Sequence, residues 1–395
     1  MSLIHFVSSW LSKASGSLYT ALGSLRIASG SLCIASLFLS VGSCAAQSAT
    51  PRAGSLPPRL SHSIDSTFRA NYPPSAPGCV VLIAEYGKPL FKKAYGQASV
   101  ELNVPDNTDN LFAIGSMTKQ FTALAVLQLE QANKLSLNDD IRKYLPGYNT
   151  HGRIITIRHL LTHTSGIADF AHLPGFLQNY TRDWSKKEQV ALFENDSLQF
   201  EPGAKWSYSN SGYLLAGLII ESVSGMSYED YVKKNIFIPL GMEHTRFGTH
   251  EEIIPHLASG YDPADSTHMM PGFYYSWSWT YAAGGILSTV DDLLKWDEAL
   301  YSDKILSQAR IKEAQSPYIL STGKSAGYGY GWFIGNDHGI TVISHGGYVG
   351  GYKSEAIRIP SKHLYAVVLS NGTLVNPGDL LRPVALKVAD IPAKP

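Results

Sequence analysis

The sequence predicts a mixed α/β fold, in which one sheet is built from both ends of the chain and a mainly helical segment is inserted between them. Strand-like runs occur over 79–95 and again over 328–369, whereas roughly 110–266 shows helical patterns and loops. With 395 residues, the chain suggests one large composite domain or two smaller ones. A ligand cleft is expected between the sheet and the helical insert.

The first 46 residues are predicted to be an export signal. Lys13 and Arg26 precede an apolar run of small residues from 27 to about 46. This is the order of a secretory signal, so we expect 1–46 to be removed and the protein to be exported, to the periplasm or outside the cell. The run ends in Val41-Gly42-Ser43-Cys44, which resembles a bacterial lipoprotein processing box, and a lipid on Cys44 would then attach the protein to the membrane. The alternatives are ordinary cleavage a few residues later and a transit peptide, although the apolar run argues against the latter.

The folded domain is expected over 59–385, after a Ser-, Pro-, Ala- and Arg-rich linker at 47–58. Leu60, Ile64 and Phe68 recur at helical spacing and predict a first helix, which a Pro-Pro pair ends. Two strands joined by a Gly-Lys turn come next: Cys79–Tyr86 and Pro89–Tyr95.

A helix that is apolar nearly all round is predicted over Met117–Gln131, and such a helix should be buried. Asn133 suits the left-handed residue that ends it. Further helices are predicted over Ile157–Thr164, Tyr213–Val223, Tyr228–Ile238 and Thr289–Tyr301. The late strands are predicted over Tyr328–Ile334, Thr341–Ser344, Ser354–Ile359 and Leu364–Leu369, before a last helix over Asp379–Asp390 that Pro383 disturbs.

Composition excludes several classes of function. Lys+Arg and Asp+Glu are both 32, so no basic excess favours a nucleic-acid partner. Cysteines are too few for a disulfide framework, and Cys79 is expected to be a small buried hydrophobe. His159 and His163 are four apart, but no third ligand and no His-Glu-x-x-His motif accompanies them, so we expect structural histidines, no metal and no cofactor. Gly-x-Ser-x-Gly is absent, which argues against an α/β-hydrolase.

The chemistry is predicted to centre on Ser116-Met117-Thr118-Lys119. A serine three residues before a lysine, at the start of a helix, puts a weak nucleophile and a base on one face. The helix N-terminus favours a developing oxyanion there. Ser321-Thr322-Gly323-Lys324 repeats the pattern, but in a glycine-containing loop.

Two further groups distinguish the first copy. Tyr208-Ser209-Asn210 lies just before a helix, where the phenol can carry a proton if a nearby ammonium lowers its pKa. Asn210 could instead be a simple helix N-cap. His345-Gly346-Gly347 is expected to end a late strand, where a residue that can be cationic is followed by glycines that let the backbone approach a ligand.

In this order, Ser-x-x-Lys, Tyr-x-Asn and His-x-Gly resemble the motifs of the serine β-lactamase and penicillin-binding-protein superfamily. The branch most similar is the class C-like one, with D,D-carboxypeptidases, D-aminopeptidases and family VIII esterases. Flanking stretches are similar too: Phe112–Ser116, Leu160–Gly166, Glu201–Gly203, Pro239–Met242, Ala283–Gly285 and Tyr328–Trp332. The resemblance implies a β-lactamase/transpeptidase-like fold, an antiparallel sheet flanked by helices. It also implies hydrolysis of an amide or ester in a small-molecule or peptide substrate.

Roles follow from the resemblance residue by residue. Ser116 would be the acylated nucleophile, and Lys119 would either act as base or lower the pKa of Tyr208, a choice left open. Tyr208 would protonate the leaving group. Asn210 would bond the substrate's acyl amide and hold Lys119. His345 would supply polarity opposite Tyr208, and the oxyanion hole would be the backbone N–H groups of Ser116 and Tyr348, next to Gly347.

One position departs from the pattern. Members that bind a substrate carboxylate usually carry a hydroxyl residue where this chain has Gly346, and its loss is worth roughly 10–100-fold in rate. This favours D-aminopeptidase or esterase chemistry, with weak β-lactam hydrolysis and a non-turnover penicillin sensor as alternatives. The aromatic run Phe273–Trp279 is expected either to wall the acyl site or to pack a loop. The oligomeric state is not predicted.

Overall fold

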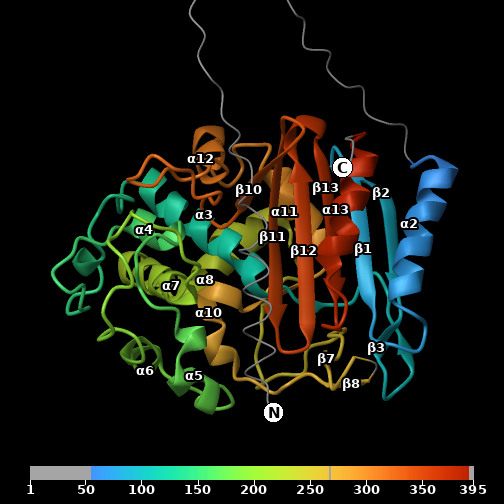
Figure 1. Ribbon diagram of the computed structural model, residues 1–395, viewed down its shortest axis with the longest axis horizontal. Coiled ribbons are helices and arrows are strands. Elements are labelled where there is room, and N and C mark those ends of the chain that lie inside the picture. Colours follow the sequence, from blue (N-terminus) through green and yellow to red (C-terminus); the bar gives the residue numbers. More distant parts are fainter. Residues whose placement is uncertain (1–54, 267, 391–395) are drawn as a thin grey trace, which may run out of the picture. The chain divides into compact units, whose positions relative to one another are not determined.

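A six-stranded antiparallel sheet organises the computed structural model, which describes residues 55–266 and 268–390 (Figure 1). The predicted signal, Cys44 and most of the predicted linker lie outside these residues. The strands in spatial order are β10 (Phe333–Asp337), β11 (Ile340–Val349), β12 (Tyr352–Ile359), β13 (Leu364–Ser370), β1 (Cys79–Glu85) and β2 (Lys88–Tyr95). The first strand pairs with the last, from Cys79 opposite Ser370 to Glu85 opposite Leu364. The predicted fold class, a sheet built from both termini, is confirmed.

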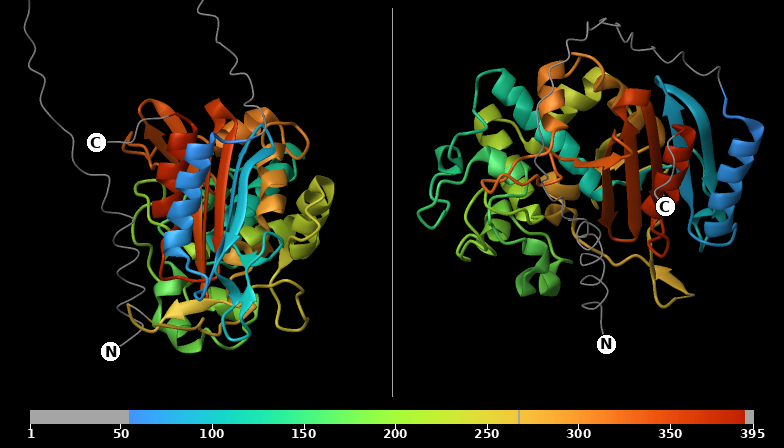
Figure 2. Two further views of the ribbon diagram at one scale, coloured as in Figure 1. Left: turned by 90° about the vertical axis from the view of Figure 1, so that its right-hand side faces the viewer. Right: turned by 45° about the horizontal axis from the view of Figure 1, so that its top comes forward.

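Both faces of this sheet are covered, which explains why its central strands are apolar on both sides. Along β1, Val80 and Leu82 enter one apolar core, and Val81 and Ile83 enter the other. Helices α2 (Pro58–Asn71) and α13 (Pro377–Val388) cover the second face, while α11 (Val290–Ala299) packs on the first (Figure 2). The helical insert lies beside β10 and β11 (Figure 1).

The insert and its connections consist of short elements around two longer helices, α3 (Thr118–Gln131) and α7 (Asn210–Ser224). The other helical elements are η1 (Gly115–Met117), η2 (Ile141–Lys143), α4 (Ile157–Leu161), η3 (Phe170–His172), α5 (Pro174–Asn179), α6 (Lys186–Ala191), α8 (Tyr228–Val232), η4 (Lys233–Phe237), α9 (Ile238–Leu240), η5 (Trp277–Trp279), α10 (Tyr281–Gly284), α12 (Gln308–Ala314) and η6 (Pro360–Lys362). The small sheets pair β3 (Gln97–Ser99) with β4 (Val104–Pro105), β9 (Ile286–Ser288) with β5 (Phe112–Ala113) and β6 (Arg246–Phe247), and β7 (Tyr261–Pro263) with β8 (Met269–Pro271).

The structure confirms several local predictions. Helix α3 is buried over most of its length, and Asn133 beyond its end has φ +56°. Gly225 ends α7 at φ +70°, because a left-handed residue satisfies the last free carbonyls. Cys79 is fully buried in the apolar core under α2 and α13.

One predicted element is wrong. The strand predicted over Tyr328–Ile334 starts only at Phe333, because Gly331 turns the chain at φ +86° against the backbone of α3. The helix predicted over Tyr228–Ile238 is confirmed as a continuous helical segment, in which the middle turn, η4, is π-helical.

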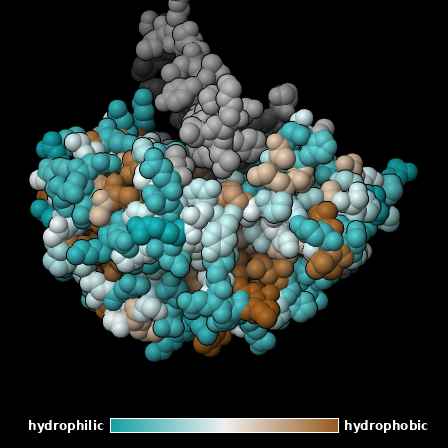
Figure 3. All heavy atoms as spheres, turned by 90° about the horizontal axis from the view of Figure 1, so that it is seen from below, coloured by the Kyte–Doolittle hydropathy of each residue, from teal (hydrophilic) through white to brown (hydrophobic). Residues whose placement is uncertain are grey.

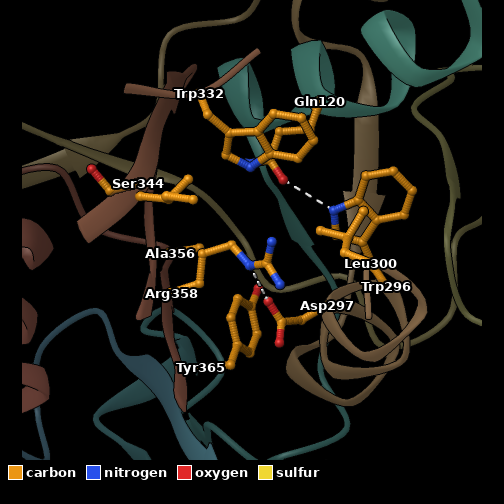
Figure 4. A pocket seen from close by; sticks show the side chains of 10 residues that line it. Gln120, Trp296, Asp297, Leu300, Trp332, Ser344, Ala356, Arg358 and Tyr365 are labelled. Carbon is orange, nitrogen blue, oxygen red and sulfur yellow. Dashed lines mark hydrogen bonds and ion pairs between the residues drawn. The ribbon is translucent and has the colours of Figure 1, made fainter. Parts of the chain in front are cut away.

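A small cavity lies inside the domain. It is lined by Gln120, Trp296, Asp297, Leu300, Trp332, Ile343, Ser344, Ala356, Arg358 and Tyr365 (Figure 4). Within it, Arg358 Nε donates to Asp297 Oδ1 at 2.7 Å, and the two side chains are 4% and 1% exposed. None of the predicted site residues lines this cavity.

Breaking this buried pair should be costly. We expect Arg358→Met to lower the free energy of unfolding by about 3–5 kcal/mol, because it leaves the Asp297 carboxylate buried without its cation. Urea unfolding measures this. The matched control is Arg153→Ala, which removes an ion pair to Glu201 between side chains that are 55% and 62% exposed and should cost less than about 1 kcal/mol. Equal losses in the two variants would contradict the prediction.

On the face seen in Figure 3, apolar side chains gather in small groups separated by polar ones. Exposed large apolar residues come from distant parts of the chain, for example Leu102, Ile154 and Ile253. Within the described residues, no helix combines the length and apolarity needed to cross a bilayer.

Candidate active site

Ser116 lies in the single 3₁₀ turn η1, which leads directly into α3. Gly115 before it adopts φ +52°, a conformation that glycine reaches without strain. One turn further, Lys119 Nζ lies 3.0 Å from Ser116 Oγ. The structure thus brings the predicted nucleophile and base together on one helix face.

Lys119 is fully buried, and its amine has three polar neighbours. Besides Ser116, Nζ donates to Asn210 Oδ1 and to the carbonyl oxygen of Ala283, both at 2.8 Å. Burial lowers the pKa of Lys119 to about 7, although the carboxylate of Asp169 opposes this shift. The amide oxygen and the carbonyl can only accept, so in the neutral amine they take its two hydrogens and leave the lone pair for Ser116.

Asn210 is oriented by Asp169, a residue that the sequence did not single out. Asn210 Nδ2 lies 3.2 and 3.1 Å from the two Asp169 oxygens, and its backbone N–H also donates to Asp169 Oδ1. This fixes Asn210 Oδ1 toward Lys119. The alternative of a simple N-cap is wrong, because Ser209 caps α7. Because Asn210 Nδ2 donates to Asp169, fewer of its hydrogens are available for the expected bond to the substrate.

Tyr208 lies under the lysine, whose Nζ is 4.8 Å from the ring centroid. Its hydroxyl hydrogen-bonds to Ser116. Burial raises the pKa of Tyr208 well above its usual value of 10, an effect that the hydrogen bond from Ser116 only partly offsets. Tyr208 is therefore a phenol at neutral pH, able to give a proton.

His345, which the sequence marked as a residue that can be cationic, is neutral in the structure. It is 2% exposed, and its Nδ1 lies 2.6 Å from the carbonyl oxygen of Gly346, so that nitrogen must carry a hydrogen. Nε2 lies 3.0 Å from the hydroxyl of Tyr328, which therefore donates to it. Burial, and secondly Lys119, lower the pKa of His345 to about 3. The ring is neutral with both nitrogens engaged, and its centroid is 6.2 Å from that of Tyr208.

The glycines after His345 lie inside β11, not at the end of a strand as predicted. A Cβ on Gly347 would meet the carbonyl oxygen of Ile114 at 2.0 Å, so only glycine lets β11 approach the segment before Ser116. A Cβ on Gly346 would instead meet Glu355 Oε2 at 2.5 Å. Successive residues of a strand face opposite sides, so a hydroxyl at 346 would not face Ser116. The expected loss of a substrate anchor at this position therefore has no geometric basis.

The predicted oxyanion donors lie close to each other. A Cβ built on Gly115 would be 2.7 Å from Tyr348 N, which places that amide beside η1. Ser354 Oγ donates to the carbonyl oxygen of Ile114 at 2.8 Å and fixes β12 to the same segment. β10 pairs only with Ile340–Ser344, so in the described part of the chain the last residues of β11 have one strand neighbour, β12.

The other residues that the sequence singled out differ in their distance from the site. His159 belongs to the cap of α4, whereas the ring of His163 lies tilted against that of Tyr208. No group of three or more potential metal ligands occurs among residues 55–266 and 268–390. Ser321 and Lys324 are exposed in a turn. In the aromatic run, Tyr275 and Trp279 are buried in packing, and Phe273 is the ring that reaches Tyr348, with centroids 6.5 Å apart.

This chain is similar to known proteins over most of its described length. The family model described as "Beta-lactamase" matches residues 67–390. The chain is 36% identical to "Penicillin-binding protein 4*" of Bacillus subtilis over 307 residues, which are 74% of this chain and 67% of that protein. It spans 59–67% of the length of the curated relatives it matches.

Solved structures are similar over most of the described chain. An octameric penicillin-binding protein homologue from Pyrococcus abyssi superposes with a TM-score of 0.73 and 30% identity, covering 84% of this chain and 77% of its own. The D-amino acid amidase from Ochrobactrum anthropi SV3, in complex with D-phenylalanine, superposes with a TM-score of 0.72 and 25% identity, covering 84% and 99%.

Proposed function

Because the chain belongs to the β-lactamase family, we propose that it is a serine hydrolase that cleaves an amide or ester through an acyl-enzyme on Ser116. The observation that carries the proposal is the 3.0 Å contact between Ser116 Oγ and the buried amine of Lys119. A serine is a weak nucleophile until a base removes its proton, and this amine is positioned to do so.

We assign the base in acylation to Lys119, the choice that the sequence left open. The neutral amine takes the proton of Ser116 while Oγ bonds to the substrate carbonyl carbon. The resulting oxyanion is stabilised by the backbone N–H groups of Ser116 and Tyr348, and each such donor is worth about 3 kcal/mol. Tyr208 is protonated and cannot serve as the first base, which supports this assignment.

Collapse of the tetrahedral intermediate breaks the bond to the leaving group, and Tyr208 supplies the proton that this group needs. The protonated Lys119, whose Nζ lies over the Tyr208 ring, then returns a proton to Tyr208. In deacylation, water attacks the ester on Ser116, the same groups accept its proton, and Ser116 leaves with a hydrogen. Over the cycle the enzyme neither gains nor loses a proton, because the hydrogens of the attacking water end on the two products.

The substrate class follows from His345. A neutral imidazole with both nitrogens bonded offers no cation to a substrate carboxylate. This disfavours a β-lactam or a peptide with a C-terminal carboxylate at that place, and it favours D-amino-acid amides and small esters. The structural similarity to D-amino acid amidase supports the same class. A non-turnover penicillin-binding sensor is the second candidate, favoured by the match to a penicillin-binding protein.

Three chromogenic substrates test this proposal. We expect steady turnover of a short p-nitrophenyl ester and of D-alanyl p-nitroanilide, with kcat/KM on nitrocefin lower than on either by at least about tenfold, since a charged hydrogen bond to the carboxylate is missing. Preference for nitrocefin would contradict the substrate class. A single burst on every substrate, without steady release, would favour the sensor.

A further inference from the structure

We propose that His163 is a positioning residue, which holds the segment Ser207–Ser209 so that the phenol of Tyr208 faces Ser116. The inference rests on the proposed function, because it has a kinetic consequence only if Tyr208 transfers a proton. His163 lies in the loop after α4, and within the described residues no hydrogen bond joins it to Ser116 or Lys119.

His163 binds the backbone on both sides of Tyr208. Its carbonyl oxygen accepts a hydrogen bond from the N–H of Ser207 at 2.9 Å. Its Nδ1 accepts another from the N–H of Ser209 at 3.1 Å. Its ring lies against the phenol, with centroids 4.2 Å apart and planes 33° apart. One residue therefore restrains the backbone before and after Tyr208 as well as the ring itself.

The Ser209 contact fixes the tautomer of His163. A backbone N–H can only donate, so Nδ1 carries no hydrogen and Nε2 carries it. Burial, followed by the charge of Lys119, holds the pKa of His163 well below its usual value. His163 and His345 are thus neutral in opposite tautomers, and the acceptor for Ser209 persists across the working pH range.

The backbone conformation and the buried Nε2 of His163 decide which substitutions can test the Ser209 contact. Its backbone has φ +58°, a left-handed conformation that few residues other than glycine adopt, although histidine, asparagine and aspartate do so more often than most. Its Nε2 is buried without a hydrogen-bond partner among the described residues. Phenylalanine at 163 would leave no buried Nε2 unpaired, and asparagine would suit the left-handed backbone. Neither phenylalanine nor glycine could replace Nδ1 as the acceptor for Ser209.

Three substitutions separate the acceptor from the ring. His163→Phe keeps an aromatic ring but leaves the Ser209 N–H without its acceptor. His163→Gly suits the left-handed backbone and removes both acceptor and ring. His163→Asn also suits that backbone, and its Oδ1 can take the place of Nδ1. His151→Phe is the matched control, because His151 is also left-handed, at φ +51°, but exposed and outside the site.

The readout is the ratio of rates on two leaving groups. A p-nitrophenolate departs without a proton, whereas an anilide nitrogen needs one from Tyr208. We expect His163→Phe and His163→Gly to lower kcat on D-alanyl p-nitroanilide by about 100-fold, the loss typical of a misplaced catalytic group. On the p-nitrophenyl ester the loss should stay below about tenfold. His163→Asn should recover most of the anilide rate, and His151→Phe should match wild type.

Equal losses on both substrates, or no loss in His163→Gly, would overturn the positioning role. If His163→Phe does not fold, as judged by thermal melting, the Gly and Asn variants decide. A serine-reactive phosphonate separates this outcome from failure of the proposed function. A wild-type protein that is neither labelled at Ser116 nor active would refute that function. A labelled, active wild type with an unaffected His163→Gly would refute the positioning role alone.

Discussion

Ser116→Ala is expected to lower kcat/KM by about 10⁴–10⁶-fold on every substrate that the wild type cleaves, because no acyl-enzyme can form without the hydroxyl. The variant should also lose covalent labelling by a serine-reactive phosphonate, which intact-mass spectrometry measures. Folding should be preserved, since Ser116 is only partly buried and its removal leaves no charge unpaired.

The chain supplies its own control for this prediction. Ser321 begins the second Ser-x-x-Lys pattern, but it is exposed in a turn, and so is Lys324. Ser321→Ala should therefore keep wild-type turnover and labelling. Phosphonate adducts that persist on Ser116→Ala, or that disappear from Ser321→Ala, would assign the nucleophile to a different residue and remove the basis of the proposed mechanism.

The sequence could locate this site because its motifs are local and chemically specific. Ser116 and Lys119 share a helix face by spacing alone, and that spacing survives folding. Asp169 could not be found in the same way. It is a lone acid in a loop, and its importance comes from Asn210, which lies 41 residues away and meets it only in the folded chain.

The charge state of His345 could not be predicted from the sequence either. A histidine followed by glycines is compatible with a cation, and only the contacts to Tyr328 and the Gly346 carbonyl show that both nitrogens are occupied. The face of residue 346 depends on where β11 ends. Glycines are disfavoured in strands, so the sequence predicted an end at Ser344. The strand continues because β12 pairs with it through Val349. The residue at 347 is glycine because the backbone of Ile114 leaves no room for a side chain there.

Lys119→Arg should also lower the rate strongly, although less than loss of the serine. A guanidinium remains charged at every accessible pH and cannot accept the proton of Ser116. We expect kcat/KM to fall by about 10²–10⁴-fold, the contribution typical of a general base. Lys324→Arg, in the exposed second copy, should leave the rate unchanged and is the matched control.

The pH profile of the wild type tests the same assignment without a mutation. Below its pKa of about 7, Lys119 is protonated and cannot act as a base. We therefore expect kcat/KM on the anilide to rise about tenfold per pH unit from pH 5 and to level off above about pH 7. If the charged lysine were needed instead, to lower the pKa of Tyr208, kcat/KM would fall through the same range. Asp169→Asn sharpens the test: its carboxylate raises the pKa of Lys119, so removing that charge should move the rising limb to lower pH. A limb that stays in place would show that another group titrates there.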